Sequence, residues 1–280
     1  MNILVLGSEG QIGKPFCKYA RSKGHTITEL DLYGFFSYDL RDPLVQRDLY
    51  TRLLDKKVDK VLFLAFDVGG SKYLREKDAS YSYIQNNVLI MANVFAVLKK
   101  SKIPFLFASS QMSNMFHTNY GFLKNLGERY TKSLNGSFCR FWNVYGYENP
   151  ADNKSHVITD LVFKGLTTNK IEVITTGEEK RQFLFVDDCS KALLAWSENK
   201  IPLSCLDITS FNWVTIQDVA KIIADKLNVP LFFGDKTDTI QGMMNEPSEE
   251  ILKYWTPDTY LTVGINKIID FQKELLGLNP

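Results

Sequence analysis

Short apolar runs alternate with amphipathic stretches through the first half of this chain. The runs have the length of strands, and strands are expected at Asn2–Leu6, Thr26–Leu30, Val61–Ala65, Pro104–Ala108 and Ser137–Trp142. Apolar residues at helical spacing predict helices at about Gln11–Ser22, Leu44–Leu54, Tyr83–Leu98 and Gly121–Lys132. Continuous apolar strands are typical of parallel sheets that are covered on both faces. The alternation therefore predicts an α/β fold with a doubly wound parallel sheet.

This alternation is lost after Gly146. Helices are expected at His156–Lys164, Asp188–Ser197, Ile216–Leu227 and Leu261–Leu276, with short strands at Ile171–Ile174 and Phe183–Val186. We interpret residues 151–280 as a smaller, mixed α/β region, and residues 1–150, with a return segment at about 187–210, as the larger domain. Ligands of open α/β sheets bind at the carboxyl ends of the strands. The smaller region is therefore expected to close over that edge and to bind the substrate.

A glycine-rich turn follows the first expected strand. It runs from Gly7 through Gly10 to Gly13, with Gln11 and Ile12 between the last two glycines. Gly7 permits a tight turn, Gly10 lets the backbone approach a pyrophosphate, and Gly13 lets the helix pack against the strand. The helix N-terminus offers unpaired N–H groups to the phosphates. Because the turn lies between a strand and a helix, it predicts a Rossmann-type dinucleotide site formed by these five residues.

Asp31 follows the second expected strand. A carboxylate at this place accepts hydrogen bonds from the adenosine ribose hydroxyls and repels a 2′-phosphate. Neither Leu32 nor Tyr33 supplies a compensating positive charge. The pattern favours NAD over NADP as the cofactor, and the alternative for Asp31 is a solvated acid at the end of a strand.

A Tyr-x-x-x-Lys pattern opens the helix expected after the fourth strand. Its spacing places Tyr120 and Lys124 on one helix face. A nearby ammonium lowers the pKa of a phenol, so that Tyr120 can exchange a proton. Ser109 and Ser110 end the preceding strand, where the Ser110 hydroxyl can hydrogen-bond the same substrate oxygen. Turn-capping serines and a chance Tyr/Lys spacing are the alternatives, and the ordered set of motifs argues against them.

The amino-acid composition limits the kinds of partner that this protein is expected to bind. The chain has 33 basic and 32 acidic residues and a formal net charge of +1, which gives no broad field to attract nucleic acid or anionic lipid. No apolar run has the length of a membrane span, and the N-terminus lacks the features of a signal peptide. We therefore expect a cytoplasmic protein without nucleic-acid or membrane partners. The four cysteines form no metal-binding pattern, so no metal is expected.

In this order the motifs resemble the NAD-dependent epimerase/dehydratase family, the extended short-chain dehydrogenases that act on nucleotide sugars. The matching pieces, which span nearly the whole chain, are Gly7–Gly13, Asp31, Asp39–Leu40, Leu64–Ala65, Asn86–Val88, Ser109–Ser110, Tyr120, Lys124, Arg140–Gly146, Arg181–Asp188 and Trp255–Ile265. The resemblance implies an NAD-dependent enzyme whose substrate is a nucleotide-diphosphate sugar. It also implies a homodimer, formed through the helices expected at 83–98 and 121–132.

Roles for further residues follow from the same resemblance. It implies that the cofactor site also includes Asp39, Leu40, Leu64, Ala65, Phe66, Asn87 and Trp142, besides Tyr120 and Lys124. On the substrate side it implies Ser110, a glycine-bearing loop that ends at Gly70, Asn143 at the phosphates or sugar, and Arg181 at the diphosphate. The alternative for Arg181 is an ordinary surface arginine. Asp187 and Asp188 are expected to cap the helix that follows them.

The residues after Ser110 bear on the type of reaction. Sugar dehydratases of the family carry an Asp-Glu pair there, and this chain has Gln111 and Met112 instead. Fucose-synthase-like relatives carry an acid/base cysteine at the second of these positions and an acid/base histidine in a segment that resembles Ser155–Ile158. His156 is therefore a candidate proton donor, and its alternative is a histidine at a helix start that faces solvent or phosphate.

Three functions remain open at this point. The leading hypothesis is a nucleotide-sugar epimerase that oxidises and re-reduces one carbon, carbon 4, with a recycled NAD. The second is a nucleotide-sugar dehydrogenase or a 4-keto-sugar reductase of the fucose-synthase kind. The third, a non-catalytic NAD-sensing protein, is disfavoured because the chain retains both Tyr120 and Lys124.

Overall fold

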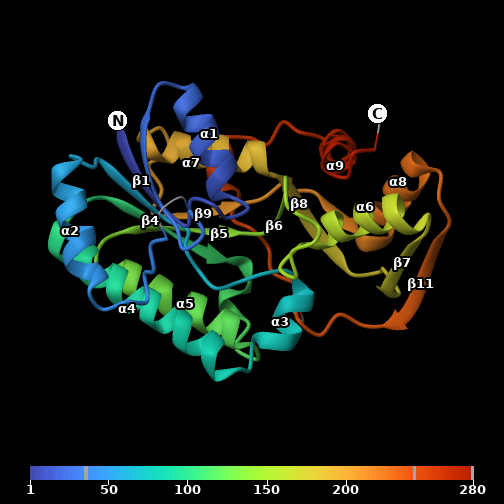
Figure 1. Ribbon diagram of the computed structural model, residues 1–280, viewed down its shortest axis with the longest axis horizontal. Coiled ribbons are helices and arrows are strands. Elements are labelled where there is room, and N and C mark those ends of the chain that lie inside the picture. The colour runs from blue at the N-terminus through green and yellow to red at the C-terminus, as the bar shows by residue number, and fades with distance from the viewer. Residues whose placement is uncertain (35–36, 242–243, 279–280) are drawn as a thin grey trace.

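A parallel sheet forms the centre of the larger part of the molecule (Figure 1). The computed structural model describes residues 1–34, 37–241 and 244–278. Within these residues, six strands pair in the order β2-β1-β3-β4-β5-β9, and every pairing is parallel. Their bounds are β1 Asn2–Leu6, β2 Thr26–Leu30, β3 Lys60–Phe63, β4 Phe105–Ser110, β5 Ser137–Phe141 and β9 Cys205–Ile208. The predicted doubly wound α/β sheet is confirmed.

Helices cover both faces of this sheet. Figure 1 shows α1 and α7 on one face and α2, α4 and α5 on the other. Their bounds are α1 Gly13–Ser22, α2 Val45–Asp55, α4 Tyr81–Ser101, α5 Asn119–Ser133 and α7 Val186–Ser197. Ile3 and Val5 of β1 pack into the core beneath α1 and α7, whereas Leu4 and Leu6 pack into the core on the opposite side. This division explains why β1 is apolar at successive positions.

A third hydrophobic core lies in the smaller part of the molecule, which is mixed α/β. Its helices are α6 Val157–Thr168, α8 Ile216–Leu227 and α9 Leu261–Leu275. Its strands form two small sheets, β10-β8-β6 and β11-β7, with the bounds β6 Asn143–Tyr145, β7 Ile171–Thr175, β8 Lys180–Phe185, β10 Trp213–Thr215 and β11 Leu231–Lys236. The side chains of Ile158, Phe183 and Val219 are among those that fill this core. The division of the chain at residue 150 stays a prediction.

Several short elements lie outside the sequence-based expectations. They are the helix α3 Ser71–Lys77, the strands β6, β9, β10 and β11, and the 3-10 turns η1 Gln111–Asn114 and η2 Glu249–Lys253. Most of them have too few residues for a periodic pattern, and the four strands pair with strands that are distant in sequence. Among the described residues, no helix combines the length and apolarity needed to cross a bilayer.

Candidate active site

The glycine-rich turn connects β1 to α1 at the carboxyl edge of the sheet. Gly7 has a φ of +88°, and a Cβ on it would lie 2.6 Å from the Ala65 backbone nitrogen. A Cβ on Gly13 would lie 2.0 Å from the Gly7 carbonyl oxygen, so this position excludes any larger residue. At Gly10 a Cβ would meet only the Gly7 oxygen, at 3.4 Å, which leaves the outer side of the turn open. No side chain caps α1, whose N-cap is Ile12.

This geometry fits a dinucleotide. An uncapped helix start beside a glycine-rich turn presents backbone N–H groups to a pyrophosphate. Asp31 lies at the edge of the same turn, because its carboxylate accepts hydrogen bonds from the Glu9 N–H and the Tyr33 N–H, both at 2.9 Å. The side-chain amide of Gln11 donates to the Val144 carbonyl at 3.0 Å and so joins the turn to β6.

Asp39, expected at the adenine, forms a bidentate ion pair with Arg41. The Arg41 Nε and Nη2 atoms lie 2.8 and 2.7 Å from the two carboxylate oxygens. The hydrogen bonds from Arg41 outweigh the effect of burial and lower the pKa of Asp39. Leu40 is buried in the core under α2 and α4. The Asp39 carboxylate is thus occupied by a guanidinium that sequence reasoning did not pair with it.

A polar network surrounds the loop after β3. Leu64, Ala65 and Phe66 follow this strand, and all three are partly buried against the two sheet cores. The Asn87 amide accepts from the Asp67 N–H at 2.7 Å and donates to the Asp67 carbonyl at 3.1 Å. It therefore ties this loop to α4.

The loop also contacts the smaller part of the molecule. The Asp67 carboxylate accepts from Tyr73 Oη at 2.7 Å and from Lys154 Nζ at 2.9 Å. A Cβ on Gly70 would lie 2.2 Å from the Ser155 carbonyl oxygen, so only glycine allows this approach. Gly70 and His156 thus lie in the same contact between the two parts of the molecule.

Ser110, Tyr120 and Lys124 converge at the carboxyl end of β4. Ser110 is buried and ends the strand, where its Oγ accepts from the Met112 N–H at 3.1 Å. Tyr120 and Lys124 lie on the first turns of α5, whose N-cap Thr118 accepts from the Gly121 N–H. Lys124 Nζ donates to the Ala108 carbonyl at 2.7 Å and lies 5.7 Å from the centre of the Tyr120 ring.

Burial changes the ionisation of this pair. It raises the pKa of Tyr120 to about 12, and a hydrogen bond with the Ser110 side chain opposes that rise. It lowers the pKa of Lys124 to about 7, against the charge of Glu128. The Lys124 ammonium also lies 3.6 Å from the centre of the Phe66 ring, a cation–π contact. Both groups are therefore sensitive to any charge that is added or removed nearby.

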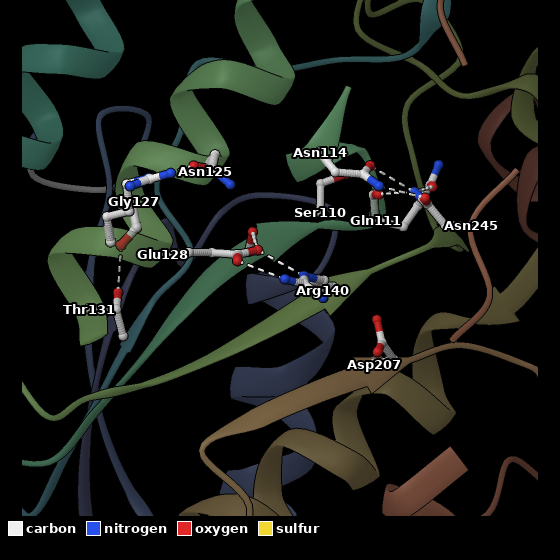
Figure 2. A network of polar contacts seen from close by, with 12 residues as sticks. Ser110, Gln111, Asn114, Asn125, Gly127, Glu128, Thr131, Arg140, Asp207 and Asn245 are labelled. Carbon is white, nitrogen blue, oxygen red and sulfur yellow. Dashed lines mark hydrogen bonds and ion pairs between the residues drawn. The ribbon is translucent and has the colours of Figure 1, made fainter. Parts of the chain in front are cut away.

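A buried carboxylate, Glu128, lies one turn farther along α5 and forms an ion pair with Arg140 (Figure 2). Both Glu128 oxygens accept from Arg140, with Nε at 2.9 Å and Nη2 at 2.8 Å. The Ser109 hydroxyl donates to the same carboxylate at 2.7 Å. Sequence reasoning placed Ser109 beside Ser110 and missed Glu128, although Glu128 follows Lys124 by four positions and thus shares its helix face.

Trp142, Asn143 and Arg181 meet in a narrow pocket next to Gln111. The pocket is lined by Gln111, Trp142, Asn143, Lys180, Arg181, Trp213, Gln241, Met244 and Asn245. Figure 2 shows Asn245 beside Gln111 and Asn114. Its amide donates to the Gln111 side-chain oxygen at 3.0 Å and to the Asn114 oxygen at 3.0 Å. The structure thus brings the expected substrate residues Asn143 and Arg181 to the carboxyl end of β4.

Arg181 is already paired. Its Nη2 lies 2.6 Å from an Asp238 carboxylate oxygen, and its Nη1 donates to the Lys180 carbonyl at 2.6 Å. Both side chains of the ion pair are only 11% exposed. Arg181 is therefore not an ordinary surface arginine, and no local sequence signal identifies Asp238 as its partner.

His156 is the N-cap residue of α6 and pairs with Glu148. Its Nδ1 lies 2.6 Å from a Glu148 carboxylate oxygen, and the Glu148 side chain is nearly buried. Burial acts to lower the pKa of His156, but the Glu148 carboxylate outweighs it, and the net shift is upward. In the described part of the chain, no hydrogen bond joins His156 to Ser110, Tyr120 or Lys124.

One expectation about the next helix was wrong. Phe185, not an aspartate, is the N-cap of α7, and no side chain caps this helix. The Asp188 carboxylate instead accepts from the Asp258 and Thr259 N–H groups, at 3.1 and 2.8 Å, and from Lys191. Asp187 pairs with Lys267 of α9. Because α7 begins earlier than expected, both aspartates lie inside its first turn and face the C-terminal segment.

Comparisons with known proteins agree with this geometry. Residues 3–202 match the model of the NAD dependent epimerase/dehydratase family. The chain is 23% identical to a putative UDP-glucose 4-epimerase of Methanocaldococcus jannaschii, over 97% of this chain and 98% of that protein. It is 28% identical to a dTDP-4-dehydro-6-deoxyglucose reductase of Escherichia coli, over 62% of this chain and 57% of that protein.

The fold is similar to that of solved epimerase structures. The crystal structure of the UDP-glucose 4-epimerase of Thermotoga maritima with UDP-glucose superposes with a TM-score of 0.81 at 16% identity, over 99% of this chain and all of that chain. Among the described residues, no cluster of acidic, cysteine or histidine side chains is arranged to hold a metal ion. With its family model covering most of the chain and a glycine turn that fits the cofactor, this protein belongs to the NAD-dependent epimerase/dehydratase family.

Proposed function

We propose that this protein is an NAD-dependent nucleotide-sugar epimerase that inverts carbon 4 of its sugar. The observation that carries the proposal is the convergence of Ser110, Tyr120 and Lys124 at the same carboxyl edge of the sheet as the glycine turn, with no acid/base residue at positions 111 and 112. Met112 is buried and has no exchangeable proton. The similarity to proteins named UDP-glucose 4-epimerase supports the same reaction.

The chain's own residues would handle the proton. NAD, when bound, supplies the hydride acceptor and donor and a positively charged ring. Tyr120 Oη takes the proton of the sugar hydroxyl as that carbon is oxidised and returns it when the keto group is reduced. Ser110 Oγ donates a hydrogen bond to the same oxygen. Once NAD is bound, the Lys124 ammonium would hold the nicotinamide ribose and favour the ionised form of Tyr120.

Arg181, Lys180 and Asn143 would hold the diphosphate and the sugar. A guanidinium fork suits paired phosphate oxygens. The tail region Glu246–Trp255 contains no arginine, and Lys180 on the pocket wall offers a second positive charge. In this proposal His156 takes no part in the reaction, because inversion at carbon 4 needs only one proton-transferring residue.

Incubation of the NAD-loaded enzyme with UDP-, GDP-, dTDP- and CDP-hexoses tests this function. We expect a 4-epimer of one of these sugars, seen by NMR or chromatography, with no net change in NADH. Stoichiometric formation or consumption of NADH would instead support a nucleotide-sugar dehydrogenase or a 4-keto-sugar reductase, an alternative favoured by the similarity to a reductase. NAD binding without turnover of any sugar would favour a sensing role.

We also propose that the protein is a homodimer. The outer faces of α4 and α5 expose Tyr81, Val88, Phe122 and Tyr130. Exposed apolar side chains on two neighbouring helices are typical of interaction surfaces. Sedimentation velocity measures the mass directly, and a monomer at all concentrations would contradict this proposal.

A further inference from the structure

Glu128 is a buried carboxylate for which the reaction described above has no use. Its side chain is 3% exposed, and it lies on α5 one turn after Lys124 and two turns after Tyr120. Positions four apart share a helix face, so all three side chains point toward β4. A buried carboxylate on the catalytic face of a helix affects both the position and the charge of its neighbours.

The contacts of Glu128 join three elements. Arg140 on β5 and Ser109 on β4 both donate to it, and these two residues are register partners in adjacent strands. The side chain of Ser113 on η1 also hydrogen-bonds the carboxylate. These bonds hold α5 at a set height above the sheet, beside the Ser110 end of β4 (Figure 2).

The packing of α5 makes this arrangement possible. A Cβ on Gly127 would lie 2.3 Å from the Phe107 ring, so the helix approaches β4 as closely as a glycine allows. At that height Glu128 reaches the Ser109 hydroxyl, and Lys124 reaches the Ala108 carbonyl. A change in the height of the helix would therefore move Tyr120 and Lys124 relative to Ser110.

Glu128 also has an electrostatic effect on Lys124. Burial lowers the pKa of Lys124 to about 7, and the charge of Glu128 acts to raise it. The thiol of Cys139 on β5 also faces the lysine, but burial raises its pKa well above the ordinary value, so it is uncharged. Tyr120, the remaining titratable group near Lys124, is neutral at neutral pH because burial raises its pKa to about 12. Glu128, whose pKa is lowered, is thus the anion that favours the charged lysine.

We propose that Glu128 is a positioning residue for the reaction, which sets the place of the Tyr120–Lys124 helix face over β4 and supports the charge of the Lys124 ammonium. Arg140 holds the carboxylate ionised and in place. This inference rests on the proposed roles of Tyr120 and Lys124. In this proposal Glu128 touches neither substrate nor cofactor and acts through Tyr120 and Lys124.

The test is the titration of Lys124 in the NAD-loaded protein, followed by NMR of side-chain-labelled lysine and assigned with Lys124→Met. Because the Glu128 carboxylate favours the charged form of Lys124, Glu128→Gln should lower the pKa of Lys124, and a fall of one unit cuts the charged fraction at a pH above it about tenfold. Glu128→Asp keeps the charge within reach of the partly exposed Arg140 and should restore most of the wild-type titration. This readout needs no substrate, so it remains valid if the proposed epimerisation fails.

Asp188→Asn is the matched control, since Asp188 is a fully buried carboxylate in an ion pair on α7. It should lower the melting temperature, as we expect for Glu128→Gln, and leave the Lys124 titration unchanged. If folded Glu128→Gln titrates at Lys124 as the wild type does, Glu128 is only structural and the proposal is overturned. If Glu128→Gln does not fold, Glu128→Asp and Ser109→Ala decide the question by the same titration, and unchanged values in both overturn the proposal.

Discussion

The ion pair between Arg181 and Asp238 predicts that an internal anion competes with the substrate diphosphate. The perturbation is Asp238→Asn, which removes the negative charge and keeps the side-chain size. Both side chains are 11% exposed, with 2.6 Å between Nη2 and Oδ2. Loss of one partner from such a pair costs about 3–5 kcal/mol, because the other charge stays buried and unpaired.

A bound diphosphate would offset part of this free-energy cost by pairing with the released guanidinium of Arg181. If it returns only about 1.4 kcal/mol, the affinity rises about tenfold. We therefore expect Asp238→Asn to bind UDP at least about tenfold more tightly than the wild type does. Its melting temperature should fall without UDP and rise more steeply as UDP is added.

Calorimetric titration of UDP measures this effect directly. Asp235→Asn is the control. Asp235 lies on β11, three positions before Asp238, and its side chain is exposed and makes no hydrogen bond to Arg181 among the described residues. It should bind UDP as the wild type does. A folded Asp238→Asn protein that binds UDP with equal or lower affinity would refute the reasoning, and would mean that Asp238 orients Arg181 for the phosphates.

Three further predictions concern single residues of the site. Tyr120→Phe should lower turnover about a thousandfold, since it removes the proton-transferring group, while an NAD titration stays unchanged; intact turnover would exclude Tyr120 from the chemistry. Asp31→Ala should weaken NAD binding and spare NADP binding, measured by paired titrations, and equal losses for the two cofactors would contradict this. Burial lowers the pKa of His156 and the Glu148 carboxylate raises it, and the net pKa lies above the ordinary value of 6.5. The ion pair therefore stabilises the fold fully below pH 6.5 and loses its effect as the pH rises through the pKa of His156 in the folded protein. The melting-temperature difference between wild type and His156→Gln should therefore shrink from acidic to alkaline pH, and a constant difference would argue against the ion pair.

Local patterns were sufficient to predict much of the larger part of the molecule. The apolar run of β1 and the glycines after it lie within thirteen consecutive residues, so strand, turn and helix could be placed from spacing alone. The expected bounds of β1, β2 and α8 agree with the structure. The short strands β6 and β10 could not be placed in this way, because β8 provides the backbone partners of both.

The site residues also fall into two groups, those that a local pattern identifies and those whose partners are distant in sequence. Ser110, Tyr120 and Lys124 were found because a helical spacing and a strand end bring them together within one strand–helix unit. Glu128 carried the same signal, and its position four residues after Lys124 would have been enough to find it. The pairing of Asp187 and Asp188 with the C-terminal segment could not be found, since their partners are distant in the chain.

The sequence by itself thus determined the dinucleotide fold, the glycine turn and the shared α5 face of Tyr120 and Lys124, because short-range spacing controls strands, turns and helix faces. Only the tertiary structure decided which charges neutralise one another. Asp238 reaches Arg181 across 57 positions, and Lys154 reaches Asp67 across 87. The physical reason is that such pairs depend on where separate elements end in space, and the packing of three hydrophobic cores sets those positions.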